Sequence, residues 1–121
     1  MEYKGIAADA IGSAKRWLAS AELNARHGSY DSALYSLEMS VEISMKAVLM
    51  CIGIDVPKTH AIGDIFASSV KSDKRIPKVF KEHVEESVDV FNALLGLRAA
   101  SGYIFETKTT MEELKAKYER Y

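Results

Sequence analysis

Three charged residues stand four positions apart in the middle of the chain: Glu38, Glu42 and Lys46. On a helix this spacing places them on one face, and Glu42 followed by Lys46 has the favourable order for an ion pair. Carboxylates can act as acids or bases, but spacing alone does not identify which of them meet in the fold. The pattern favours a solvated helix face, and the alternative is a polar pair in a cleft between two protomers.

His60 and Asp64 are also four positions apart, as two metal ligands on a helix would be. Two ligands are too few for a metal site, and no second His or Cys pair has suitable spacing. We therefore predict neither a metal nor a cofactor, and we expect His60 to lie in the first turn of a helix. Lys58 can bind an anion weakly at that helix N-terminus, although the segment lacks the glycines of a phosphate loop.

The charge balance argues against a protein whose whole surface binds nucleic acid, because the net charge is −1. Basic residues concentrate between positions 71 and 81, where they could meet phosphates. Acidic residues follow closely, and no aromatic side chains interleave with the basic ones to stack bases. We therefore favour an ordinary solvated surface for this segment.

The size and composition are those of one small globular domain. The chain has 121 residues, 48% hydrophobic and 27% charged, so we treat 1–121 as a single domain. Charged residues interrupt the N-terminal segment, which argues against a signal peptide, and no apolar run approaches the length of a membrane span. The one cysteine, Cys51, excludes an intrachain disulfide. We expect Cys51 to be buried and the protein to be cytoplasmic.

Apolar residues recur at steps of three and four in five segments, which is the period of amphipathic helices. The segments are 7–25, 34–52, 62–70, 80–97 and 111–121. Gly28 and Gly53 are natural helix ends, since glycine accepts the left-handed conformation. Thr59 is a candidate N-cap for the third helix, and Thr110 with Glu113 makes a capping box for the fifth. Short connections favour an all-α, up-and-down bundle of four to five helices, largely antiparallel.

Four sequence segments keep a distinctive order and spacing along nearly the whole chain. The first is A-x-L-N-A-R before Gly28, and the second is E-x-x-x-K-A-x-L, which begins at Glu42. The third is G-x-x-x-P-x-T-H, which ends at His60, and the fourth is Arg98 followed by Tyr103. Together these segments resemble the HEPN domain, a small helical domain of nucleotide-binding and RNA-processing systems.

The resemblance implies a helical bundle that is commonly a homodimer, with an arginine near the end of the fourth helix facing a cleft between protomers. In catalytic relatives a histidine follows that arginine after four to six residues, and the pair cleaves RNA without a metal. Arg98 matches the arginine, but Tyr103, Ile104 and Phe105 occupy the histidine positions. We therefore assign no catalytic residue and expect a protein that is not an enzyme.

The resemblance implies a non-catalytic module that binds a nucleotide or RNA phosphate. It also implies a minimal nucleotidyltransferase as partner, as in prokaryotic toxin–antitoxin pairs. Arg98, Tyr103 and Lys58 are the candidate ligand contacts. The alternative for the first two is structural: Arg98 satisfies carbonyls at the helix end, and Tyr103 packs the corner.

The polar residues Glu42, Lys46 and His60 are the candidates for a dimer cleft. Two alternative functions stay open. One is a divergent, metal-independent ribonuclease that uses Arg98 and takes its proton-transfer group from Tyr103 or from His60 of the partner subunit. The other is a purely structural helical adaptor that pairs with another helical protein.

Overall fold

The computed structural model describes residues 3–98 and 109–121, and every regular element in these residues is a helix. The helices are α1 (Tyr3–Arg26), α2 (Tyr30–Cys51), α3 (Gly63–Ser72), α4 (Lys78–Glu82), α5 (Val84–Gly96) and α8 (Met111–Arg120). The prediction of an all-α bundle is confirmed. None of these helices is long and apolar enough to cross a membrane.

The predicted helix ends and the predicted capping box are present. Gly28 and Gly53, which follow α1 and α2, have φ angles of 76° and 80°, a region that strains residues with a Cβ. The Thr110 hydroxyl accepts a hydrogen bond of 3.2 Å from the backbone N–H of Glu113 at the start of α8. These local signals therefore set where the chain turns.

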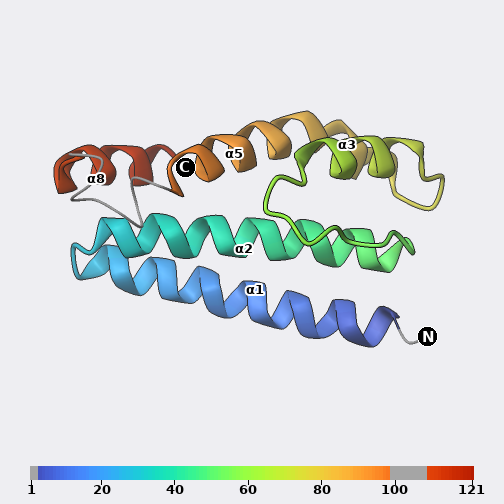
Figure 1. The fold of residues 1–121 in the computed structure, drawn as a ribbon, viewed down its shortest axis with the longest axis horizontal. Helices are drawn as coiled ribbons and strands as arrows, with labels where there is room; N and C mark the ends of the chain where they lie inside the picture. The colour runs from blue at the N-terminus through green and yellow to red at the C-terminus, as the bar shows by residue number, and fades with distance from the viewer. Residues whose placement is uncertain (1–2, 99–108) are drawn as a thin grey trace.

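Helix α2 lies in the middle of the molecule, with α1 along one side and α3, α5 and α8 along the other (Figure 1). The contact between α1 and α2 is made by small side chains, because Ala7, Ala14 and Ala21 are all buried. The Ser40 hydroxyl donates a 2.8 Å hydrogen bond to the Ala14 carbonyl across this contact. Small residues let the two helix backbones approach closely, while the larger Leu18 of the same predicted stripe stays exposed.

The opposite side of α2 carries two apolar clusters separated by a polar stretch. One cluster contains Leu34, Leu94 and Leu114, and the larger one contains Met45, Leu49, Ile62, Phe66, Val70, Val84, Val88 and Phe91. Between Leu34 and Met45, α2 buries the side chains of Glu38 and Glu42. Charged groups in such a position need partners, and these partners define the candidate site described below.

The third helix begins later than predicted, at Gly63 rather than beside Thr59. Thr59 instead accepts a 3.3 Å hydrogen bond from the backbone N–H of Ala61, so it shapes a turn before the helix. A Cβ on Gly63 would lie 3.0 Å from Asn92 and 3.2 Å from Val88, so the start of α3 packs closely on α5. His60 consequently lies in the connection between α2 and α3, not in a first helical turn.

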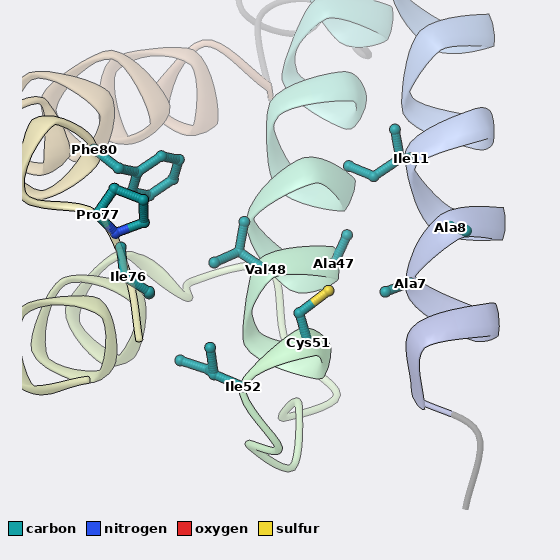
Figure 2. Close-up of a pocket in the computed structure, with 10 residues that line it drawn as sticks. All are labelled: Ala7, Ala8, Ile11, Ala47, Val48, Cys51, Ile52, Ile76, Pro77 and Phe80. Atoms are coloured by element: carbon teal, nitrogen blue, oxygen red, sulfur yellow. The ribbon is translucent and has the colours of Figure 1, made fainter. Parts of the chain in front are cut away.

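The predicted fourth helix is divided at His83 into α4 and α5. Helix α4 leaves an open apolar groove of about 410 Å³ between itself, α1 and the C-terminal half of α2 (Figure 2). Ile11 of α1, Phe80 of α4 and Cys51 of α2 line this groove, and all three are exposed. The prediction that Cys51 is buried was wrong, because none of the described helices covers this end of the contact between α1 and α2.

Candidate functional site

Arg98, which follows α5, forms an ion pair with Glu38 in the middle of α2. The Nη1 atom of Arg98 donates a hydrogen bond of 2.7 Å to Oε2 of Glu38, whose side chain is fully buried. The other carboxylate oxygen, Oε1, has no hydrogen-bond partner among the described residues. Arg98 itself is 22% exposed, so its guanidinium reaches from the buried carboxylate to the surface.

Two further side chains of α2 fix the position of the Arg98 guanidinium. Its Nη2 atom donates a hydrogen bond of 2.9 Å to the Tyr35 hydroxyl, and its central carbon lies 4.8 Å from the centre of the Tyr35 ring. The Sδ atom of Met39 lies 3.8 Å from Nη1. A guanidinium carries five N–H donors, so these contacts leave donors that have no partner among the described residues.

Glu42 lies one helical turn after Glu38 and connects three basic side chains. Its carboxylate accepts hydrogen bonds from Lys46 Nζ at 3.1 Å and from His60 Nδ1 at 2.9 Å, and its Oε1 lies 3.7 Å from Arg98 Nη1. The Glu42 side chain is only 3% exposed. The expectation of a solvated face was therefore wrong for both Glu38 and Glu42. Arg98 at the end of α5 contacts both carboxyl groups, and His60 before α3 also contacts Glu42.

The two carboxyl groups have pKa values shifted in opposite directions. Burial and, after it, the neighbouring Glu42 raise the pKa of Glu38 to about 8, against the opposing charges of Arg98 and Lys46. Burial also acts to raise the pKa of Glu42, but Glu38, Lys46 and His60 together outweigh it and lower that pKa. Of the two carboxyl groups, Glu42 is therefore the more readily ionised, and Glu38 the more readily protonated.

His60 presents one ring nitrogen to solvent. Because an ionised carboxylate only accepts hydrogen bonds, the Nδ1 atom bonded to Glu42 carries the ring proton. The Nε2 atom is then the free nitrogen, on a side chain that is 55% exposed. A carboxylate behind a histidine in this way fixes the orientation of the ring and leaves Nε2 able to accept a proton.

The structure brings together four of the six predicted site residues. Arg98, Glu42, Lys46 and His60 form one network through the Glu42 carboxylate, all within one protomer. Lys58 lies exposed in the same connection as His60 and makes no ion pair or hydrogen bond with a described residue. Tyr103 lies outside the described residues.

The partners of Arg98 were not predicted as such. Tyr35, Glu38 and Glu42 are spaced by three and four residues along α2, so the sequence does place them on one helix face. Nothing in the sequence pairs that face with a residue sixty positions later. Among the described residues, no three His, Cys, Asp or Glu side chains gather as a metal site requires.

Comparison with protein families identifies the chain. The model of the HEPN domain matches residues 7–120, which includes most of α1 and all the other helices. The chain belongs to the HEPN domain family. The predicted resemblance is thus confirmed, and the family is one of nucleotide- and RNA-related modules whose members commonly dimerise. Comparisons of this HEPN domain with curated proteins and with solved structures gave no significant match.

Proposed function

We propose that this HEPN domain binds a phosphate group of a nucleotide or of RNA at Arg98, without cleaving it. The observation that carries the proposal is the placement of Arg98. Glu38 and Tyr35 hold its guanidinium in one position, and part of the side chain remains exposed. A preorganised, partly exposed guanidinium is well suited to bidentate phosphate recognition.

The charge of the surrounding network supports the same proposal. Arg98 and Lys46 both lie beside the Glu42 carboxylate, and the raised pKa of Glu38 disfavours a second negative charge there. His60 adds a polar nitrogen at the surface beside them, and Lys58 is two residues away in the same connection. An anionic ligand at Arg98 would therefore meet a favourable field.

We also propose that the domain is a dimer and that it acts with a minimal nucleotidyltransferase in a toxin–antitoxin-like pair. Membership of the HEPN family supports both proposals. The exposed apolar side chains of α1 and α4, including Ile6, Leu23 and Val79, offer surface that a second chain could cover. Analytical ultracentrifugation tests the first statement, and copurification with a coexpressed nucleotidyltransferase tests the second.

The test of phosphate binding compares two arginines. Isothermal calorimetry with adenosine monophosphate and a short single-stranded RNA is done on the wild type, Arg98→Lys and Arg75→Lys. Arg75 is the matched control, because it is exposed and pairs with Asp73 away from the site. We expect Arg98→Lys to lose about tenfold in affinity, since lysine cannot form a bidentate contact. Equal affinities in all three proteins would refute the proposal.

One specific observation favours a second candidate, metal-independent cleavage of RNA. His60 lies in the same protomer as Arg98, is oriented by Glu42 and keeps Nε2 free, so it could take the role of the missing histidine. Incubation of RNA in chelator, with His60→Gln as the comparison, separates the two candidates. Cleavage that His60→Gln abolishes would replace the binding proposal, and intact RNA would end this alternative.

A further inference from the structure

Arg98 lies at one end of a row that continues through two aromatic rings. Its guanidinium lies over the Tyr35 ring, and the Tyr35 ring contacts Trp17 with a centroid distance of 6.4 Å and an interplanar angle of 59°. Arg98 follows α5, Tyr35 is on α2 and Trp17 is on α1, so the row crosses α2 from one side of the molecule to the other. The Arg98 guanidinium and the two aromatic rings of Tyr35 and Trp17 therefore lie next to one another.

The two rings are not core side chains. Both Trp17 and Tyr35 are partly exposed, whereas Phe91, the largest side chain of the apolar core, is completely buried. Leu18, the residue after Trp17, is exposed as well. Part of each aromatic surface therefore faces solvent beside a guanidinium that has donors unpaired within the described part of the chain.

We propose that Trp17 and Tyr35 form a base-stacking subsite beside Arg98, so that the ligand is a nucleotide unit with its phosphate on Arg98 and its base against the rings. This inference rests on the proposed phosphate binding at Arg98. Aromatic side chains next to a cationic side chain are the usual means by which proteins hold unpaired bases. A phosphate alone would satisfy Arg98 but would leave the aromatic surface unused.

The chemistry of the subsite also defines which bases it accepts. Stacking reads the flat face of a base, and every base has such a face. The two rings contact each other, and the Arg98 guanidinium contacts the Tyr35 ring and hydroxyl, so recognition of the base rests on stacking. The subsite therefore binds purines more tightly than pyrimidines, through their larger area, and requires an unpaired base.

The first experiment needs no variant, because Trp17 is the only tryptophan in the chain. Its fluorescence is followed while the wild-type protein is titrated with adenosine monophosphate, a short single-stranded oligoadenylate RNA or ribose 5-phosphate. A base stacked on the ring quenches the emission, whereas a phosphate without a base does not. We expect quenching by the two base-bearing ligands and affinities about tenfold higher than for ribose 5-phosphate.

The second experiment removes the stacking surface. Trp17→Leu keeps an apolar side chain in the contact between α1 and α2 but has no ring, and binding is measured by calorimetry. We expect its affinity for adenosine monophosphate to fall about tenfold, to the level of ribose 5-phosphate, whose own binding stays unchanged. Tyr118→Leu is the matched control: Tyr118 makes a similar ring contact, at 5.9 Å, with Tyr30 of α2 but lies on α8.

The outcomes separate this inference from the proposed function. If ribose 5-phosphate and adenosine monophosphate bind equally and emission is unchanged, the phosphate site stands and the stacking subsite is refuted. If neither base-bearing ligand nor ribose 5-phosphate binds, both are refuted. Quenching by oligoadenylate alone supports the subsite and identifies single-stranded RNA as its ligand, whereas quenching by the mononucleotide as well identifies a free nucleotide.

Discussion

Two arginines of this HEPN domain pair with carboxylates at almost the same distance but in opposite surroundings. Arg98 lies 2.7 Å from Glu38, which is sixty residues away and fully buried. Arg75, whose side chain is 67% exposed, lies 2.6 Å from Asp73, which is two residues away and 15% exposed. The pKa of Asp73 falls to about 2 through its hydrogen bonds to Arg75, while burial raises the pKa of Glu38 to about 8. Both carboxyl groups have an arginine partner, so the opposite directions of the two pKa shifts follow from the difference in burial.

The comparison indicates where the fold depends on an ion pair. A local, exposed pair forms between neighbours in the sequence and contributes little, because water solvates both charges when it breaks. A buried contact between distant segments lacks that solvation, so removing Glu38 leaves the Arg98 guanidinium without its principal hydrogen-bond acceptor. Arg98 and Glu38 tie the end of α5 to the middle of α2 between the two apolar clusters.

The largest effect is expected for Glu38→Ala. The substitution removes the principal partner of Arg98 and opens a cavity in α2, so the free energy of unfolding should fall by about 3 to 5 kcal/mol. Urea denaturation followed by circular dichroism measures it. Asp73→Ala is the matched control and should change the value far less than Glu38→Ala does. Similar values for the two variants would contradict the contrast between the pairs.

The second largest effect is expected in the pH dependence of stability, which should differ between the Arg98–Glu38 pair and the Arg75–Asp73 pair. Because the pKa of Glu38 is about 8 in the folded protein and ordinarily 4.5, the folded state holds an extra proton between these values. Stability therefore falls as pH rises through this window, by up to about 1.4 kcal/mol per pH unit, and then levels off. Urea midpoints between pH 5 and 8 should fall less steeply in Glu38→Gln than in the wild type. Parallel curves would show that Glu38 does not titrate there.

Asp73 should act in a different pH range and in the opposite direction. Its pKa is lowered from 3.8 to about 2, so its contribution is present above pH 3.8 and is lost as the pH falls through that range. Asp73→Asn should therefore weaken the loss of stability below pH 4 and leave the slope of the curve above pH 5 unchanged. A change in the neutral range would mean that the exposed pair matters more than solvent screening allows.

A smaller effect is expected for Tyr35→Phe, which keeps the ring but removes the hydroxyl that accepts from Arg98 Nη2. Loss of one such hydrogen bond should lower the free energy of unfolding by about 1 kcal/mol. Ligand affinity should fall a few-fold, because the guanidinium is less firmly oriented. Calorimetry checks the second effect, and Tyr30→Phe, in the other aromatic pair, is the control.

The smallest effect should come from Arg75→Ala. The substitution removes the exposed pair with Asp73 and a hydrogen bond of 2.9 Å to the Ile52 carbonyl. The Arg75 side chain is largely exposed and water can replace its contacts, so the free energy of unfolding should change the least in this series. A loss of stability as large as that of Glu38→Ala would contradict the conclusion that the exposed pair contributes less than the buried one.

Most of the fold could be predicted from local sequence signals, but the burial of single residues could not. Periodic apolar residues, Gly28, Gly53 and the Thr110 cap located the helices, since each acts within a few residues. The exposure of Cys51 and the burial of Glu42 depend on which helix covers which face, a property of the whole bundle. The predicted fourth helix is divided at His83, and histidine is not a helix-breaking residue, so the sequence did not indicate this division.

The candidate site shows the same limit. Arg98, Glu42, Lys46 and His60 could each be singled out by residue type and by resemblance to the family. Their meeting at one carboxylate depends on contacts that span 18 and 56 to 60 residues, and spacing along a helix does not encode these. Trp17 and Tyr35 could not be joined to Arg98 at all, because three separate helices position them.

The packing of α1 has a consequence for how the molecule opens. Helix α1 contacts mainly one neighbour, through alanines, so it should form a cooperative unit that detaches before α2 and α5 separate. Its backbone amides should then exchange with solvent deuterium faster than those of α2. Detachment of α1 would separate Trp17 from Tyr35, whereas the contact between Arg98 and Glu38 would remain. A base-bearing ligand should consequently slow exchange along α1, whereas a phosphate alone should not.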